Sequence, residues 1–140
     1  QKEPLVLSLL VKLRNYKVLT FCSSIEQSER ICRHNITSKN RDSEKNLELF
    51  NRNEIKHISA CNILNEGVNL TNCRVGIFCN LNSSEIITKQ RIGRILRHEF
   101  PIVIIPYFVD TREQELVAKI IEEYNVESVK SISSINKIEL

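Results

Sequence analysis

The chain has 140 residues, which suits one folded domain, and its apolar content of 41% and charged content of 26% are ordinary for a globular protein. Its net charge of +3 is too small to identify a nucleic-acid-binding protein by itself. The five cysteines show no CxxC spacing and the histidines are scattered, so we expect buried thiols in a reducing compartment rather than disulfides or a metal site. No apolar run approaches about 18 residues and no signal peptide is evident, so we expect a cytoplasmic (intracellular) protein without a membrane span.

Apolar strands alternate with helical patterns along the chain. Pro4 begins the first helical pattern, and Ser24 with Gln27 three residues later forms a capping box that predicts the start of the second helix. Pro106 marks an edge, a bulge or an end in the last apolar strand. In chain order, the pattern predicts a helix at 4–13, a strand at 17–22, a helix at 24–34, a short strand at 35–38, a helix at 42–51, strands at 55–61 and 74–79, a helix at 84–98, a strand at 102–109 and a helix at 112–124.

Near-continuous apolar strands that alternate with helices are typical of an α/β domain whose parallel sheet is covered on both faces. Such sheets place their ligand sites at the carboxyl ends of the strands. In this chain polar segments begin at the ends of three predicted strands, at 22–24, 61–69 and 80–84. We therefore expect these three segments to border the functional site.

The segment 90–97 carries the most informative pattern. Read as a helix, it places Gln90, Arg94 and Arg97 at i, i+4 and i+7, in one narrow arc. Gly93 lies beside this arc, and a glycine inside a helix is favoured where something must approach the backbone closely. Two guanidinium groups, an amide and bare backbone would suit a phosphate group. Taken alone, however, such a stripe is more often a solvated helix face, so other features of the sequence must decide.

Other chemistries find little support in the sequence. Neither a GxxxxGK[ST] loop nor a GxGxxG loop occurs. Ser23 and Ser84 have no histidine partner to which the sequence points. Nucleophilic catalysis by Cys22 or Cys61 is less expected than burial of both thiols in the core.

Four segments follow one another in a fixed order: KVLTFCSS, HISACNILNEGVNL, VGIFCNLNSS and QRIGRILRH. In this order they resemble the C-terminal RecA-like lobe, or helicase C-terminal domain, of a superfamily 2 DEAD/DEAH-type helicase or translocase. The first segment resembles motif IV, Ser59 to Leu70 resembles motif V, and Gln90 to Arg97 matches motif VI as Q-x-x-G-R-x-x-R. Motif VI alone would be weak, but its coupling to the upstream EGVNL makes the resemblance specific over about residues 17–110.

The resemblance implies an α/β RecA-like three-layer domain with a mainly parallel central sheet and helices on both faces. We expect residues 1–125 to form this helicase C-terminal domain and residues 126–140 to form a terminal strand or tail, the start of a removed extension. The initial glutamine and the lack of methionine also predict a fragment of a longer polypeptide or a processed chain, and we expect the fragment to be monomeric.

The resemblance also implies a nucleotide site shared with a first RecA-like lobe of the same polypeptide. That lobe would bring the phosphate loop and the Mg²⁺ ligands, so ATP and Mg²⁺ are expected only in the full enzyme. Arg94 and Arg97 would be arginine fingers that contact the terminal phosphate, where such groups contribute about 10³–10⁵ in rate. Gln90 would sense the nucleotide, and Gly67 and Asn69 would lie near its ribose and phosphates.

The resemblance further implies that loops after the strands grip the backbone of DNA or RNA. Hydroxyls and backbone N–H groups suit phosphate contacts without sequence readout. The candidates are Ser23, Ser24, Cys61, Asn62 and Ser83, and helix capping would explain Ser83 equally well.

Two positions depart from the family pattern. Asn69 stands where many members carry Asp, and Cys61 stands where many carry Thr or Ser. Because a thiol is a poor donor, a phosphate contact at Cys61 would be lost or taken over by the backbone N–H. Both departures weaken a detailed transfer of roles within motif V.

We therefore interpret the chain as the second motor lobe of an ATP-dependent nucleic-acid helicase or translocase, with no ATP hydrolysis by the fragment alone. Two alternatives stay open. One is a non-catalytic RecA-like scaffold or interaction module, which the departures at Cys61 and Asn69 favour. The other is the motor part of a restriction or repair complex, in which the same lobe has different neighbours.

Overall fold

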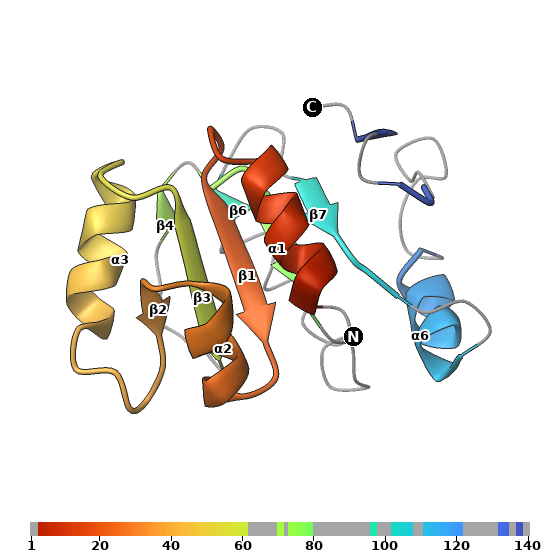
Figure 1. Cartoon of the computed structure of the whole chain (residues 1–140), viewed down its shortest axis with the longest axis horizontal. Helices are drawn as coiled ribbons and strands as arrows, with labels where there is room; N and C mark the ends of the chain where they lie inside the picture. Colours follow the sequence, from red (N-terminus) through yellow and green to blue (C-terminus); the bar gives the residue numbers. More distant parts are fainter. Residues whose placement is uncertain are drawn as a thin grey trace.

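The computed structural model of the chain describes residues 3–61, 70–71, 73–79, 96–97, 102–107, 111–121, 132–134 and 137–138. In these residues the main sheet is parallel and five-stranded, with the strand order β2-β3-β1-β5-β7 (Figure 1). Two short strands form a separate parallel pair, β4-β6. The strands are β1 (Val18–Cys22), β2 (Asn35–Ile36), β3 (His57–Cys61), β4 (Leu70–Thr71), β5 (Val75–Phe78), β6 (Leu96–Arg97) and β7 (Ile102–Ile104).

Helices cover both faces of the main sheet. Those with described bounds are α1 (Glu3–Lys12), α2 (Ile25–Ile31), α3 (Ser43–Asn51) and α6 (Arg112–Ile121). Side chains of α1 and α2 join one buried cluster, and side chains of α3 and α6 join the other. The result is a three-layer α/β arrangement with β1 at its centre.

All five residues of β1 are buried, because β1 lies between β3 and β5 and has helices on both sides. Side chains of a strand point alternately to opposite faces of its sheet. Val18 and Cys22 belong to the cluster under α1 and α2, whereas Leu19 and Phe21 belong to the cluster under α3 and α6. A continuous apolar run is therefore what this position in the fold requires.

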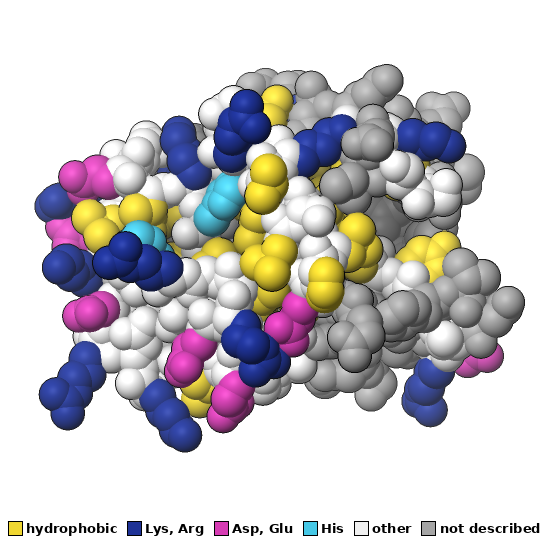
Figure 2. Space-filling model, in the orientation of Figure 1, with side chains coloured by type: hydrophobic (Ala, Val, Ile, Leu, Met, Phe, Trp, Pro, Cys, Tyr) yellow, Lys and Arg dark blue, Asp and Glu magenta, His cyan; other side chains and the backbone are white. Residues whose placement is uncertain are grey.

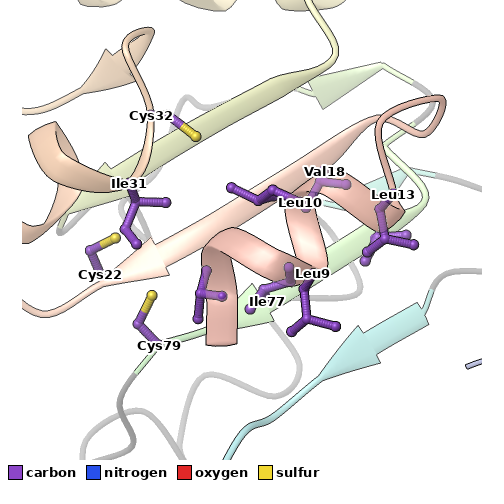
Figure 3. Close-up of a cluster of buried hydrophobic side chains, with 11 residues drawn as sticks. Leu9, Leu10, Leu13, Val18, Cys22, Ile31, Cys32, Ile77 and Cys79 are labelled. Carbon is purple, nitrogen blue, oxygen red and sulfur yellow. The ribbon is translucent and has the colours of Figure 1, made fainter. Parts of the chain in front are cut away.

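The first cluster shows why α1 packs where it does. Its buried residues Val6, Leu9, Leu10 and Leu13 recur at i, i+3, i+4 and i+7, the spacing of one helix face. Figure 3 shows Leu9, Leu10 and Leu13 above Val18 of β1 and Ile77 of β5, with the thiols of Cys22 and Cys79 at the carboxyl ends of the same strands. The face of α1 thus matches the two central strands.

The second cluster is built around aromatic side chains. The rings of Phe21 and Phe78 are stacked, with centroids 4.5 Å apart and an interplanar angle of 11°, so they join β1 to β5 on this face. Phe50 of α3 is fully buried and lies under the Lys17 ammonium group, whose Nζ is 4.4 Å from the ring centroid. Burial lowers the pKa of Lys17.

Most elements agree with the sequence-based prediction where the chain is described. The capping box is confirmed, since Ser24 is the N-cap of α2 and its Oγ accepts a hydrogen bond from Gln27 N–H. Strand β7 ends at Ile104, before Pro106, which is one of the three roles that the sequence allowed for that proline. Helix α2 ends at Ile31 rather than at His34, because Asn35 enters the sheet immediately afterwards.

The predicted helix at 84–98 is wrong at its carboxyl end. Leu96 and Arg97 form strand β6, paired in parallel with Leu70 and Thr71 of β4. Pairing with β4 gives the backbone N–H and C=O groups of these residues hydrogen-bond partners in a sheet in place of those within a helix. Gly93, three residues before Leu96, also lowers the helical preference of this segment. Residues 84–95 lie outside the described part of the chain, so the rest of this predicted helix remains a prediction.

Candidate functional site

The carboxyl ends of three central strands meet at one edge of the sheet. Cys22 of β1 pairs in register with Cys61 of β3, and Phe21 pairs with Phe78 of β5. The first residues after β1 are Ser23 and Ser24, which lead directly into α2. This is the edge at which parallel α/β sheets bind their ligands, so the sequence-predicted segment 22–24 borders it as expected.

A small hydrogen-bond network fixes the two serines. The Gln27 side-chain oxygen Oε1 accepts a hydrogen bond from Ser23 N–H at 3.0 Å and lies 3.4 Å from Ser23 Oγ. Gln27 N–H in turn donates to Ser24 Oγ at 3.1 Å. Gln27 is buried, whereas Ser23 is exposed and Ser24 is half-buried. A buried amide therefore holds an exposed hydroxyl at the end of the central strand.

Helix α2 is tied to the neighbouring strand by a second pair of serines. Ser59 Oγ of β3 donates to the Ser28 carbonyl oxygen at 2.6 Å, and Ser28 Oγ donates to Ser59 Oγ at 3.0 Å. Both side chains are fully buried. These bonds join the middle of α2 to β3 and so help to fix the helix that follows Ser23 and Ser24.

Cys61 differs from the hydroxyl residue common in the family. Its side chain is buried, with 6% of its surface exposed, and burial, with a smaller effect from Glu26, raises the pKa of its thiol. A buried, protonated thiol is a weak donor and is poorly placed to contact a phosphate. Of the nucleic-acid candidates that the structure describes, Ser23 and Ser24 present hydroxyls at the edge and Cys61 does not.

Two further thiols, Cys22 at this edge and Cys32 at the far end of α2, are also core groups. A hydrogen bond with Cys79, together with burial, raises the pKa of the Cys22 thiol, and burial raises the pKa of Cys32 to about 11. Such thiols are protonated and inert near neutral pH. In the described part of the chain, no group of three His, Cys, Asp or Glu side chains could hold a metal ion.

The β4-β6 pair brings the ends of the two motif-like segments together. Leu70 and Thr71, at the end of the motif V segment, lie beside Leu96 and Arg97, at the end of the motif VI segment. Because Arg97 lies in a strand, the prediction that it shares a helical arc with Gln90 and Arg94 at i, i+4 and i+7 is wrong for Arg97. The pairing instead places the two segments side by side through their backbones.

The remaining candidates lie outside the described residues. These are the predicted nucleotide contacts Gly67, Asn69, Gln90 and Arg94, and the predicted nucleic-acid contacts Asn62 and Ser83. Their assigned roles stay predictions from the resemblance.

The sequence reasoning missed two groups that position this edge. It gave Gln27 only a capping role, whereas Gln27 also holds Ser23, one residue before the cap. It gave no role to the Ser28–Ser59 link, because a hydrogen bond between residues 31 positions apart leaves no local pattern. The available signal was a serine inside the buried strand β3, since a buried hydroxyl needs a hydrogen-bond partner.

Comparison with known proteins gives the same class as the motifs. The family model described as the helicase conserved C-terminal domain matches residues 1–99. No curated protein matches the sequence. Among the described residues, no helix is both long and apolar enough to cross a lipid bilayer.

Solved structures share the fold at low sequence identity. The yeast DEAD-box splicing factor Prp28 has a TM-score of 0.70 and 15% identity, with 95% of this chain and 33% of that chain covered. The helicase domain of Hef from Pyrococcus furiosus has a TM-score of 0.59 and 21% identity, with 84% of this chain and 26% of that chain covered. S. cerevisiae Dbp5 L327V, bound to RNA and ADP BeF3, has a TM-score of 0.67 and 12% identity, with 86% and 35% covered.

The parallel sheet of this chain, with helices on both faces, is the RecA-like α/β fold of helicase C-terminal domains. Because the family model matches more than half of its residues, the chain belongs to the helicase conserved C-terminal domain family. The chain spans about a quarter of the Hef helicase domain and about a third of Prp28.

Proposed function

We propose that this chain is the second motor lobe of an ATP-dependent helicase or translocase that acts on DNA or RNA. The observation that best supports the proposal is the β4-β6 pair, in which the end of the motif V segment lies beside the end of the motif VI segment. In the family pattern both segments serve the nucleotide site. Their pairing would put the predicted nucleotide contacts into one neighbourhood.

In this proposal the first RecA-like lobe supplies the phosphate loop and the Mg²⁺ ligands, and this chain supplies cations. Arg94 and Arg97 neutralise the charge that builds on the transferred phosphoryl oxygens. Gln90 contacts the nucleotide, and Gly67 and Asn69 border its ribose and phosphates. The nucleotide in Dbp5 L327V, ADP BeF3, is consistent with such a use of ATP in a structure of the same fold.

The proposed nucleic-acid grip uses the exposed edge after β1 and its neighbours. Ser23 offers an exposed hydroxyl held by Gln27, and Ser24 keeps the donor capacity of its hydroxyl because its Oγ acts as acceptor in the cap. Asn62 and Ser83 complete the proposed contacts. The Cys61 thiol is buried, so a phosphate contact at this position is either lost or taken over by the backbone N–H. These contacts would bind the sugar-phosphate backbone without reading the sequence.

A non-catalytic RecA-like module is the second candidate. The observation in its favour is the buried Cys61 thiol, which removes a side-chain contact that many family members make. The retained Gln90-Arg91-Ile92-Gly93-Arg94 run favours the motor over the scaffold, since a scaffold has no use for it.

Measurement of ATP hydrolysis with and without single-stranded DNA and RNA tests the proposal. We expect nucleic-acid-stimulated turnover from the polypeptide that carries both lobes, and none from residues 1–140 alone, because this sequence has no phosphate loop. Turnover by residues 1–140 alone would show that the site has been assigned to the wrong lobes. Absence of turnover in the two-lobe polypeptide would favour the scaffold.

A further inference from the structure

A groove lies on the opposite side of the domain from the candidate site. It has a volume of about 580 Å³ and runs between α1, the end of α2 and the start of β3. His57 is the first residue of β3, Arg14 follows α1 and Arg33 follows α2, so the groove borders the amino ends of the parallel strands. A partner bound there would leave the carboxyl-end edge free.

The floor of the groove is apolar and open to solvent. Leu7 and Val11 of α1 line it with 43% and 66% of their surfaces exposed, and Ile31 and Ile55 continue the apolar lining. Figure 2 shows hydrophobic side chains exposed in the middle of this face, with histidine and basic side chains close to them. Exposed side chains of this size on neighbouring turns of one helix mark a contact surface rather than scattered surface residues.

The rim of the groove is basic. Arg14, Arg33 and Lys56 line it together with His34 and His57, and among its described lining residues none is acidic. Ion pairs in the described part of the chain join Arg30 to Glu3 and Arg52 to Glu48, so they do not neutralise this rim. Cations near the ends of α1 and α2 also suit the helix dipoles, but the dipoles do not account for the exposed Leu7 and Val11 beside them.

We propose that this groove binds an acidic amphipathic helix of another protein. Apolar side chains at i, i+3, i+4 and i+7 of that helix would fill the floor, and Asp and Glu residues on both sides of this stripe would meet the rim. The inference does not depend on the proposed ATPase activity. It depends on the combination of an apolar floor with a rim of one charge sign.

Two other occupants fit less well. Nucleic acid would use the cations, and His34 and His57 could stack on bases, but a sugar-phosphate backbone would leave the apolar side chains of Leu7 and Val11 without a contact. A second copy of this chain in a two-fold dimer would set one basic rim against the same basic rim. An acidic helix satisfies both the charge and the apolar surface.

The test uses the purified full-length protein and a fluorescein-labelled synthetic peptide. The peptide carries leucines at i, i+3, i+4 and i+7 with glutamates on both flanks, and fluorescence anisotropy measures its binding. A scrambled peptide of the same composition and a peptide with Lys in place of Glu are the controls. We expect saturable binding of the acidic amphipathic peptide alone, which weakens as salt concentration rises.

Matched substitutions locate the binding. Val11→Glu and Arg33→Glu should each weaken binding by about tenfold or more, as for residues central to an interface. Ile132→Glu, at a side chain 44% exposed, and Lys45→Glu, on the exposed surface of α3, lie outside the groove lining and should leave the dissociation constant within about twofold. Circular dichroism checks that each variant is folded, and Val11→Ser replaces Val11→Glu if the latter does not fold.

Several results would overturn the proposal. Equal binding of the scrambled peptide would show that no amphipathic stripe is recognised, and equal effects of groove and control variants would place binding elsewhere. The groove would be a nucleic-acid site if the protein binds labelled single-stranded RNA, if Arg33→Glu but not Val11→Glu weakens that binding, and if the peptide displaces the RNA. A dimer in sedimentation velocity that Val11→Glu dissociates would make it a self-association surface.

Discussion

At the scale of single residues, Ser24 links the local sequence to the geometry of the candidate edge. Its Oγ caps α2 by accepting the Gln27 N–H bond, and Gln27 in turn holds Ser23. We expect Ser24→Ala to lower the free energy of unfolding by about 1 kcal/mol, the usual effect of losing an N-cap. Urea unfolding measures the change. Ser8→Ala, at an exposed position of α1, is the control and should cause no loss.

The cap assignment has a clear point of failure. If Ser24→Ala and Ser8→Ala give the same unfolding midpoint, the hydrogen bond at Ser24 contributes nothing to stability and the network around Ser23 is looser than its distances indicate.

Because the Cys32 thiol is buried, we expect the protein to lose stability at alkaline pH. Burial raises its pKa from 9.0 to about 11, so between these values the folded state keeps a proton that the unfolded chain releases. The folded state then binds more protons, and the free energy of unfolding falls with rising pH, by up to about 1.4 kcal/mol per pH unit for one thiol. Below pH 9 this contribution is fully present. Above about pH 11 its loss is complete.

Paired unfolding curves over pH 8–11.5 test this behaviour. The difference in stability between the native sequence and Cys32→Ala should shrink as pH rises through the window. Ile31→Val, which alters the same cluster without a titratable group, should give a difference that does not depend on pH. A constant difference for Cys32→Ala as well would mean that this thiol ionises equally easily in the folded state.

At the residue scale the sequence predicts contacts within one helical turn better than contacts between distant segments. The pattern S-S-x-x-Q predicts the cap because both partners lie within one helical turn. Burial of the Cys61 thiol was also expected, because Cys61 lies in an apolar run, and it is confirmed. The Ser28–Ser59 link was missed, because the two serines lie 31 positions apart and no local window contains both.

At the scale of elements, α1 is held to the sheet by one face. Leu9 is 2% exposed and packs above the central strands (Figure 3), whereas Leu5, one turn earlier in the same helix, is 42% exposed. We expect Leu9→Ala to cost about 2–5 kcal/mol in the free energy of unfolding, because it leaves a cavity. Leu5→Ala should stay within about 0.5 kcal/mol. Guanidinium unfolding of both variants measures the contrast.

Comparable losses for the two variants would contradict this packing of α1. A larger loss for Leu5→Ala would mean that Leu5, rather than Leu9, is the side chain that faces the sheet.

Strands with continuous apolar runs were predictable because burial on both faces leaves little room for polar residues. The strand at 96–97 was not predictable. Ile92, Ile95 and Leu96 have the spacing of a helix face, and this spacing predicts a helix that continues to His98. The pairing of Leu96 and Arg97 with Leu70 and Thr71 is a contact between residues 26 positions apart, and it overrides that local preference.

At the scale of the whole molecule, the order of motifs identified the class and the parallel sheet agrees with it. The motif segments also placed the site at the carboxyl ends of the strands, where Ser23 and Ser24 lie in the structure. The first RecA-like lobe and the nucleic acid are proposed partners of this chain, and both are inferred from the resemblance to helicases. The basic groove at the opposite edge was not predicted, since its lining comes from three separated segments.

The central proposal is that Arg94 neutralises phosphoryl charge on a nucleotide bound by the first lobe. The most direct measurement is nucleic-acid-stimulated ATP hydrolysis by the two-lobe polypeptide with Arg94→Ala, beside Arg52→Ala as a control arginine on the surface next to α3, paired with Glu48. We predict that Arg94→Ala lowers kcat by about 10³-fold or more with an unchanged unfolding midpoint, and that Arg52→Ala keeps normal turnover. Near-normal turnover in Arg94→Ala would contradict the motor-lobe account.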